Sequence, residues 1–356
     1  MRISGYRLYR YALPLAPPAG AGGAGLRRRE GVLLRLEAEG ASGWGEAAPL
    51  SGFSRETPAQ AARALQKVLP GLLGLDLEEA RLPRGGLPPS ARFALELALL
   101  GARAAASGRP LPELLSPSPQ PEVEVSALLS GPPETVLEEA RRMRAAGYRA
   151  FKLKVGGRPV EEDVRLVRSL GEELGGSVTL RLDANRAWEF PEALRFAAAG
   201  LRFLYVEEPL RDPAGLPELV RRGNLPVALD ESLFGMEPEG LAGHRYARAA
   251  VLKPTLLGGL SRTLRFARAA RELGMEVAVS SAYESGVGTL GLLALAAACG
   301  APAGLDPYRS LARDVLRPRP ALAAPRLVVG AAFSARRAVA REALEELLGD
   351  AGGGGE

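Results

Sequence analysis

Cysteine and histidine are almost absent from the 356-residue sequence. Cys299 is the only cysteine, so no disulfide can form within the chain, and His244 is the only histidine. A zinc site built from several histidines is therefore excluded, and one cysteine with one histidine would be an unusual pair for zinc. Because Cys299 lies in an alanine-rich apolar run, we expect it in the core rather than in a Cys–His nucleophile pair.

The sequence also lacks the patterns of a secretory signal and of a membrane span. No N-terminal segment joins a basic flank to an apolar stretch, which argues against a secretory signal. The longest apolar run, residues 290–305, is interrupted by Gly300 and Pro302, and a membrane helix needs about 20 predominantly apolar residues. We therefore predict a cytoplasmic protein without a membrane partner.

The formal net charge of +5 does not indicate nucleic-acid binding. Along the predicted helices, arginines alternate with acidic residues, and such runs usually form solvated faces. The one basic cluster, Arg27–Arg29, follows a stretch rich in glycine, alanine and proline and has no interleaved aromatic residues. We therefore expect no nucleic-acid partner.

Lysine is the scarcest of the common charged residues. Only four of the 46 cationic residues are lysines, and all the others are arginines. Lys67 lies in a polar helical pattern, whereas Lys152, Lys154 and Lys253 lie in apolar strand patterns. Arginine stays protonated, but lysine can lose its proton when its surroundings are arranged for it. The three strand lysines are therefore predicted to do something that arginine cannot.

The first 118 residues predict a mixed α+β domain. Hydrophobic residues make up 47% of the chain, which is enough for a sizeable core. The length allows two domains, or one large barrel with an attachment. The predicted elements are strands over residues 3–15 and 31–50, helices over residues 58–69 and 90–107, and a mobile loop over residues 17–25.

From about residue 123, short apolar strands alternate with amphipathic helices. This alternation predicts a parallel sheet. About eight strands, without a Gly-rich dinucleotide fingerprint, favour a closed barrel over residues 119–315 rather than an open doubly wound sheet. Residues 316–356 are predicted to pack on the barrel or the N-terminal domain, with a helix over residues 334–348 and a disordered tail over residues 349–356.

Ionisable residues recur where the predicted barrel strands end, which is where catalytic residues of such barrels lie. Two lysines come first, then three acids, then a third lysine, in steps of 23–29 residues. Each step is one strand–helix unit, so we expect these side chains to form a ring around one mouth of the barrel. They are Lys152 and Lys154, then Asp183, Glu207, Asp230 and Lys253.

Asp183, Glu207 and Asp230 are the predicted metal ligands. Three carboxylates from successive strands offer oxygen ligands, which suits Mg²⁺ or Mn²⁺ when water and substrate oxygens complete the shell. The alternative is that the acids form surface ion pairs with neighbouring arginines, and that the lysines only pair with the same carboxylates.

Lys154 and Lys253 are the predicted catalytic residues, facing each other across the metal site. A free lysine has a pKa of about 10.4, and a useful base needs a pKa of roughly 7–8. Burial, a nearby dication and a second lysine, Lys152, would lower the pKa of Lys154, while the carboxylates would raise it. The net charge of the site therefore decides whether a lysine can act as the base.

Flanking polar residues are expected to support these groups. Asn185 ends the third strand, and Glu208 and Glu231 each follow a predicted ligand. By strand alternation both acids should point away from the metal. They could orient ligands or lysines, or form plain ion pairs.

Two further predictions concern the barrel interior and the seventh strand. Arg181 shares strand parity with Asp183, so it is expected to pair with a carboxylate inside the barrel. Ser280 and Ser281, with backbone N–H groups near a predicted helix start, could hold a substrate carboxylate. Helix capping is the alternative for these serines.

Taken in order, the motifs resemble the enolase superfamily in its muconate-lactonizing branch, and are most similar to its o-succinylbenzoate synthase family. The segment over residues 91–115 also resembles the capping-domain helix of that superfamily. The motifs are KLK at 152–154, RLDANRAW at 181–188, EEP at 207–209, LDES at 229–232, LKPTLLGG at 252–259 and SSAYESGVG at 280–288.

This resemblance implies an N-terminal capping domain over a modified (β/α)7β barrel, with Mg²⁺ on the three acids. It implies dehydration of 2-succinyl-6-hydroxy-2,4-cyclohexadiene-1-carboxylate to 2-succinylbenzoate, a menaquinone precursor. By similarity, Lys154 takes the α-proton and returns it to the leaving hydroxyl, while Lys253 stabilises the enediolate as a cation. Loops over residues 17–26 and 50–57 should close over the succinyl side of this small carboxylate substrate.

The nearest alternative is an N-succinylamino acid racemase or another epimerase that uses the same two lysines as opposed acid and base. The segment at 304–311 lacks the Asp-x-Asp pair of dipeptide epimerases, and RAW at 186–188 favours the synthase. Sugar-acid dehydratases need a histidine near the seventh strand. His244 precedes the sixth strand, so this reaction is rejected.

A catalytically dead barrel that only binds ligands should have lost a metal ligand or a lysine. This sequence keeps all of them. A homo-oligomer is compatible with the sequence.

Overall fold

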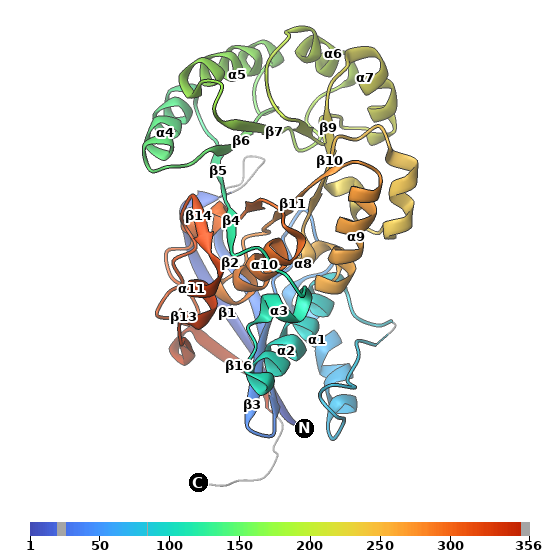
Figure 1. The fold of residues 1–356 in the computed structure, drawn as a ribbon, viewed down its shortest axis with the longest axis vertical. Coiled ribbons are helices and arrows are strands. Elements are labelled where there is room, and N and C mark those ends of the chain that lie inside the picture. Colours follow the sequence, from blue (N-terminus) through green and yellow to red (C-terminus); the bar gives the residue numbers. More distant parts are fainter. Residues whose placement is uncertain (20–25, 84, 350–356) are drawn as a thin grey trace.

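Two sheets organise the chain, and both are visible in Figure 1. The computed structural model describes residues 1–19, 26–83 and 85–349. A four-stranded antiparallel sheet belongs mainly to the N-terminal part, and eight parallel strands form the second sheet. Residues 20–25 of the predicted loop, and all of the predicted disordered tail except Gly349, lie outside the described residues.

The antiparallel sheet has the strand order β16-β1-β2-β3. Helix α2 lies so close to β3 that a Cβ atom at Gly45 would stand 1.8 Å from the carbonyl oxygen of Ala94, so glycine is required there. Helices α1 and α2 confirm the two predicted helices, and β1 continues through three residues of the predicted loop. The elements are β1 (Ile3–Ala19), β2 (Leu26–Ala38), β3 (Ala41–Ala47), α1 (Pro58–Val68), η1 (Leu69–Leu72), α2 (Pro89–Ser107) and α3 (Leu111–Leu115).

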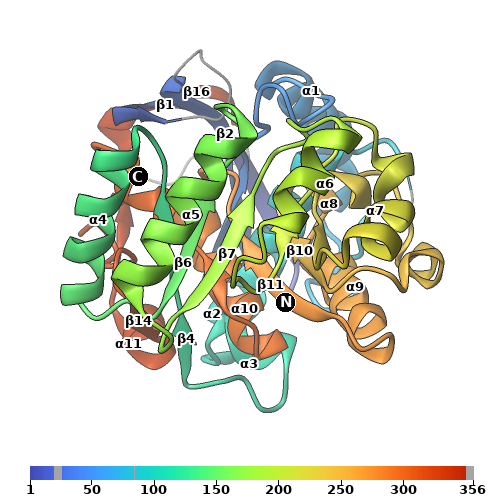
Figure 2. The same ribbon diagram turned by 90° about the horizontal axis from the view of Figure 1, so that it is seen from above.

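The parallel sheet forms a barrel with the strand order β12-β11-β10-β9-β8-β7-β6-β5. A parallel bridge between Val125 and Ala303 joins its two edges. Figure 2 shows the helices on the outside of these strands. The predicted fold class, a (β/α) barrel with an α+β N-terminal domain, is confirmed. The strands are β5 (Ser126–Leu129), β6 (Ala150–Lys154), β7 (Thr179–Asp183), β8 (Val206–Glu207), β9 (Val227–Leu229), β10 (Ala249–Leu252), β11 (Glu276–Ser280) and β12 (Ala303–Gly304).

Amphipathic helices connect most of the barrel strands, as the alternating pattern predicts. Between β9 and β10 the described connection contains only 3₁₀ turns, so this unit departs from the regular plan. The connecting elements are α4 (Pro133–Ala145), α5 (Val160–Leu174), α6 (Phe190–Ala198), η2 (Pro213–Gly215), α7 (Leu216–Gly223), η3 (Glu231–Leu233), η4 (Pro238–His244), α8 (Pro254–Leu257), α9 (Leu260–Glu272) and α10 (Gly286–Cys299).

The prediction of a helix over residues 334–348 is wrong. Over these residues the chain instead forms strand β15, the 3₁₀ turn η6 and then strand β16, which pairs antiparallel with β1 and covers that edge of the sheet. Unpaired edge groups of β1 gain partners in this way, so long-range pairing outweighs the local helical pattern. The remaining elements are β4 (Glu122–Glu124), η5 (Asp306–Ser310), β13 (Leu316–Arg317), β14 (Arg326–Val328), α11 (Val329–Ser334), β15 (Ala338–Val339), η6 (Arg341–Ala343) and β16 (Leu344–Gly349).

Two buried glutamates of the N-terminal part cap the first turns of barrel helices. Glu96 of α2 accepts hydrogen bonds from the backbone N–H groups of Leu260 and Ser261, at 2.5 and 3.0 Å, where α9 begins. Glu46 of β3 accepts from the backbone N–H and hydroxyl of Ser285, at 2.8 and 2.6 Å, where α10 begins. These contacts join the two parts through helix ends that would otherwise lack partners.

We predict that Glu96→Ala lowers the free energy of unfolding by about 2–4 kcal/mol, because buried N–H groups of α9 lose a charged acceptor. Thermal or denaturant unfolding measures this change, and the exposed Glu79 supplies a control, Glu79→Ala. Equal stability of the two variants would show that the contact does not join the parts as described.

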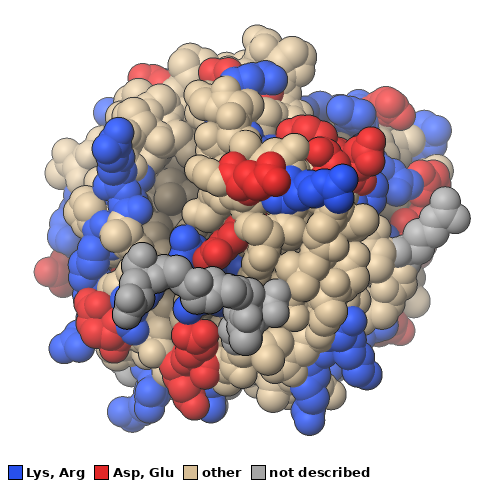
Figure 3. Space-filling model, turned by 90° about the horizontal axis from the view of Figure 1, so that it is seen from below, with Lys and Arg blue, Asp and Glu red and all other residues tan. Residues whose placement is uncertain are grey.

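The face that Figure 3 shows has no broad patch of one charge. Among the described residues, no helix combines the length and apolar character needed to cross a bilayer. In Figure 3, basic and acidic side chains interleave over the surface. This interleaving agrees with the solvated helical faces expected from the sequence.

Candidate active site

The predicted strand-end residues lie together at the carboxyl ends of the barrel strands. Lys154 of β6 pairs in register with Asp183 of β7, and Asp183 pairs with Glu207 of β8. Asp230 directly follows β9, and Lys253 directly follows β10. The strand–helix units have similar lengths. Residues separated by 23 to 29 positions therefore lie at the ends of neighbouring strands.

The three acids are buried, and each contacts at least one lysine. Asp183, Glu207 and Asp230 are 1%, 2% and 0% exposed. The Lys152 ammonium lies 2.7 Å from an oxygen of Asp183 and 2.5 Å from an oxygen of Glu207. Lys154 donates to Asp183 at 2.6 Å, and Lys253 donates to Asp230. Cations and carboxylates are therefore concentrated in one largely dehydrated space.

The lysines differ in electrostatic state. Burial lowers the pKa of Lys154, and the ammonium groups of Lys152 and Lys253 add to this effect against the attraction of Asp183. Burial also opposes the charge of Lys253, but Asp230, Glu231 and Asp183 together outweigh burial and raise the pKa of Lys253. The pKa of Lys152 is raised further, because Asp183 and Glu207 outweigh its burial. Lys154 is thus the lysine best placed to become a neutral base.

The donor set has the chemistry of a divalent-cation site. All three acids offer oxygen, and one oxygen of Asp230, Oδ1, is buried without a hydrogen-bond partner. Burial, together with the nearby carboxylates of Asp183 and Asp230, raises the pKa of Glu207 to about 7. A bound cation would offset the repulsion among these carboxylates. As the side chains lie, the described residues include no three His, Cys, Asp or Glu groups arranged to share an ion. Instead, the carboxylate oxygens of the three acids contact the lysine ammonium groups.

Asn185 links Lys154 of β6 to Glu231. Its Oδ1 accepts from the Lys154 ammonium, and its Nδ2 donates to Glu231 at 3.1 Å. Its backbone N–H donates to Asp183 at 3.0 Å. Its φ of 44° lies in the left-handed region, which residues other than glycine rarely adopt. Such strain persists where the surroundings over-determine the backbone, as is common at functional sites.

Glu208 organises the loop that carries Asp230. This fully buried acid accepts from the backbone N–H groups of Asp230 and Ser232, at 2.9 and 2.7 Å. It also forms an ion pair with Arg186 at 3.0 Å. Glu208 therefore forms an ion pair and also holds the backbone of Asp230, a predicted metal ligand. No pattern in the sequence indicates Arg186 or Ser232 as its partners.

The expected ion pair of Arg181 with a carboxylate is wrong, and so is the helix-capping alternative for Ser280 and Ser281. Arg181 donates to the hydroxyl of Ser126 at 2.6 Å, and among the described residues no carboxylate lies within ion-pair distance of it. Ser285, rather than Ser280 or Ser281, caps α10. The backbone N–H groups of Ser281, Ala282 and Tyr283 already bond to acceptors within the protein, so these three are not free to hold a substrate carboxylate.

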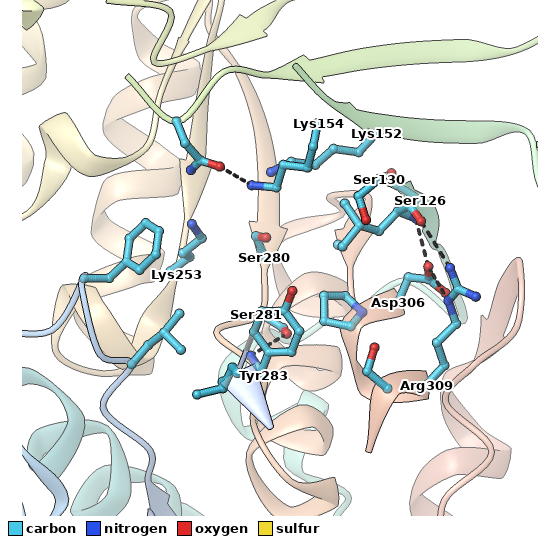
Figure 4. Close-up of a pocket in the computed structure, with 18 of the residues that line it drawn as sticks. Ser126, Ser130, Lys152, Lys154, Lys253, Ser280, Ser281, Tyr283, Asp306 and Arg309 are labelled. Atoms are coloured by element: carbon cyan, nitrogen blue, oxygen red, sulfur yellow. Dashed lines mark hydrogen bonds and ion pairs between the residues drawn. The ribbon is translucent and has the colours of Figure 1, made fainter. Parts of the chain in front are cut away.

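A cavity of about 890 Å³ opens beside these groups, and Figure 4 shows its lining. Lys152, Lys154 and Lys253 enter it from the barrel, together with Ser280 and Ser281. The side away from Lys253 is lined by polar residues that no sequence motif indicated, namely Ser126, Ser130, Asp306 and Arg309.

The N-terminal part closes one side of this cavity. Leu26 and residues 50–53 belong to its lining, as was expected for the two loops. The ring of Phe53 lies 5.4 Å from the Lys253 ammonium, a cation–π contact that no sequence motif indicated. Both parts of the chain therefore shape the space in which a substrate would meet the lysines.

Two family models match the chain. The model described as enolase C-terminal domain-like matches residues 135–329, and that described as MenC, N-terminal domain, matches residues 3–102. Among curated proteins, an o-succinylbenzoate synthase of Edwardsiella ictaluri is 32% identical, covering 89% of this chain and 94% of the relative. One of Yersinia pseudotuberculosis is 33% identical, covering 88% and 93%.

Solved structures share the fold. Muconate lactonizing enzyme from Pseudomonas fluorescens, complexed with muconolactone, has a TM-score of 0.84 and 26% identity, covering 96% of this chain and 97% of that chain. Dipeptide epimerase from Enterococcus faecalis, complexed with Mg and a dipeptide, has a TM-score of 0.85 and 24% identity, covering 93% and 98%. The latter likeness supports the fold alone.

Proposed function

The chain belongs to the enolase superfamily and, within it, to the o-succinylbenzoate synthase family, and on this basis we propose its reaction. The enzyme, a lyase, dehydrates 2-succinyl-6-hydroxy-2,4-cyclohexadiene-1-carboxylate to 2-succinylbenzoate in menaquinone biosynthesis. The observation that carries this proposal is a pair of lysines that line one cavity and contact buried acids, Lys154 with Asp183 and Lys253 with Asp230. A small-molecule carboxylate substrate and a cytoplasmic location are parts of the same proposal.

Lys154 is the proposed base. Its neutral Nζ removes the proton on the carbon next to the substrate carboxylate, and its lowered pKa makes that neutral form accessible. The electron pair left behind expels the hydroxyl group as the ring becomes aromatic. Lys154 returns its proton to the leaving oxygen, so water departs and the lysine is neutral again. Asn185, which accepts from the Lys154 ammonium, orients the Nζ atom.

Lys253 is the proposed electrostatic partner. Its raised pKa keeps it cationic, and it lies in the same cavity as Lys154 but on a different strand. A cation in a dehydrated site stabilises the negative charge that develops on the substrate carboxylate as the proton leaves. The Phe53 ring and Asp230 hold its ammonium group.

Mg²⁺ is the proposed cofactor, with Mn²⁺ as a substitute. Asp183, Glu207 and Asp230 would hold it through oxygen atoms, which both ions prefer. The bound ion would supply a Lewis acid that polarises the substrate carboxylate. Support comes from the all-oxygen donor set and the unpartnered Asp230 Oδ1. Glu231, which accepts a hydrogen bond from Asn185, would help to orient these ligands without binding the ion itself.

The likeness to known proteins favours the synthase over a two-lysine racemase. The MenC N-terminal family model matches residues 3–102, and the two o-succinylbenzoate synthases are 32% and 33% identical over most of the chain. The lysine pair alone does not separate the two reactions, because a racemase also begins each turnover with one neutral and one protonated lysine. In the dehydration a single lysine both takes and returns the proton.

An ultraviolet absorbance assay tests the proposed function. Purified protein with Mg²⁺ should convert the cyclohexadiene substrate to 2-succinylbenzoate, and EDTA should stop the conversion. Restoring Mg²⁺ in excess of the chelator should restore the rate. Absence of the aromatic product at every Mg²⁺ concentration would rule out the synthase.

The pH dependence of kcat/KM should follow the neutral form of Lys154. Because its pKa is lowered, kcat/KM should rise with pH along a limb whose midpoint lies below about 10.4, the value of free lysine. Lys253, with a raised pKa, should keep its proton through this limb, so no fall is expected there. A midpoint at or above the free-lysine value would contradict the assignment of Lys154 as base.

A further inference from the structure

Arg29 of β2 is a buried cation whose hydrogen bonds all end on main-chain carbonyl groups. It is 3% exposed, although Arg27 and Arg28 beside it are exposed. Its guanidinium donates to the carbonyl oxygen of Tyr283 at 3.0 Å and to that of Pro49 at 2.8 Å. It also donates to the carbonyl oxygens of Ala48 and Glu30. One side chain thus joins three separate backbone segments.

Two of these segments lead directly into the walls of the cavity. Ala48 and Pro49 precede residues 50–53, which line it from the N-terminal part, and Tyr283 lines it from the barrel. Phe53, within the first of these segments, lies over the Lys253 ammonium. Arg29 therefore lies behind two adjoining parts of the cavity wall, and it is not itself among the residues that line the cavity.

The barrel wall depends on such a contact because its backbone is strained. Tyr283 has a φ of 62°, which a non-glycine residue adopts only when its surroundings hold it. Its N–H donates to the Ser281 hydroxyl at 3.1 Å, and Arg29 binds its carbonyl oxygen. The turn is thus held on both sides, from the barrel and from the N-terminal part.

Arginine suits this position better than other cations. Its planar guanidinium carries five donors in a fixed fork, whereas a lysine ammonium is a compact point charge. Bonds from Nε, Nη1 and Nη2 diverge to carbonyl groups of different segments. Because a buried cation without these acceptors would be costly, the carbonyl groups and the arginine fix one another's positions.

We propose that Arg29 is a positioning residue that holds residues 48–53 of the N-terminal part against residues 281–283 of the barrel, and so sets the shape of the substrate cavity. It touches neither the predicted metal ligands nor the catalytic lysines. Its contribution falls on substrate binding rather than on metal binding or proton transfer. The kinetic part of this inference rests on the proposed function, and the structural part does not.

Two variants and a matched control test the proposal. Arg29→Met keeps an unbranched stem but removes every donor, and Arg29→Lys keeps the charge without the fork. Arg28→Met makes the same change at the exposed neighbour. For each protein, kcat and KM for the cyclohexadiene substrate are measured with saturating Mg²⁺. Hydrogen–deuterium exchange of residues 48–57 and 281–285 is measured without substrate.

Arg29→Met should raise KM about tenfold or more while kcat changes by less than about threefold, because the cavity walls lose their alignment but the lysines keep their contacts. Exchange should become faster in both segments together. Arg29→Lys should lie between this variant and the wild type, and Arg28→Met should match the wild type in both measurements. The rise in melting temperature caused by Mg²⁺ should be the same in all four proteins.

Unchanged exchange in either segment of Arg29→Met would overturn the proposal, as would a loss confined to kcat. If Arg29→Met does not fold, Arg29→Lys decides by the same two measurements. If the wild type lacks dehydratase activity, the proposed function fails, while the exchange data still accept or reject the role of Arg29.

Discussion

Replacing Lys154 by arginine should reduce kcat/KM for dehydration by about 10²–10⁴-fold, because general-base catalysis is lost with the group proposed to take the proton. Arginine keeps the positive charge beside Asp183 but stays protonated at any pH at which the protein folds. The Lys154 ammonium also contacts Asn185, so the larger guanidinium will disturb that contact, but the surrounding acids still have a cation.

The control for this variant is Lys67→Arg on the exposed face of α1. Both proteins should show the wild-type melting temperature within a few degrees and the same circular dichroism. Initial rates from the ultraviolet assay measure the difference. Activity of Lys154→Arg within tenfold of the wild type would show that another group is the base.

Replacing Glu207 by glutamine should remove most of the stabilisation that Mg²⁺ gives to the fold. A ligand at 100 times its Kd stabilises a protein by about 2.7 kcal/mol, so Mg²⁺ should raise the melting temperature of the wild type by several degrees. Glutamine keeps the shape of the side chain but removes the charge that attracts the cation. Asp230→Asn should behave in the same way, because Asp230 supplies a buried oxygen without a partner.

The measured quantity is the difference in melting temperature with and without Mg²⁺. Glu207→Gln also loses its ion pair with Lys152, so its metal-free stability changes as well. The exposed Glu172 of α5 supplies a control, Glu172→Gln, with the same change of charge. A full Mg²⁺-induced rise in Glu207→Gln would place the metal elsewhere.

The barrel and the positions of its polar strand ends could be predicted because both depend on local periodicity. A parallel strand followed by a helix repeats at a nearly constant length, so residues one unit apart reach the same end of neighbouring strands. Lys154, Asp183 and Glu207 consequently lie in one row across three strands. The scarcity of lysine gave a second signal, which was independent of spacing.

Contacts between distant segments could not be predicted in this way. Strand β16 forms because β1 has an open edge, a fact that no pattern within residues 334–348 expresses. Arg181 shares the strand parity of Asp183, yet it bonds to Ser126, two strands away, rather than to a carboxylate. Arg29 has the same strand parity as Arg27, so alternation cannot distinguish the buried residue from the exposed one.

The opposed electrostatic states of the lysines also required the folded arrangement. Lys152 and Lys154 are two positions apart on one strand, yet the pKa of the first is raised and that of the second is lowered. The difference arises because Lys152 reaches both Asp183 and Glu207, whereas Lys154 contacts only Asp183 among the acids. Neighbouring positions in the sequence can therefore have different roles in the reaction.

The central claim, a dehydratase with one base and one fixed cation, is tested most directly by comparing two substrates in one preparation of the enzyme. The value of kcat/KM is measured for the cyclohexadiene substrate by absorbance, and for α-proton exchange of an N-succinylamino acid in D₂O by NMR. We predict that Mg²⁺-dependent dehydration exceeds exchange by at least about 100-fold, because the site stabilises the transition state of the first reaction better. Exchange as fast as dehydration, or exchange without dehydration, would contradict this account.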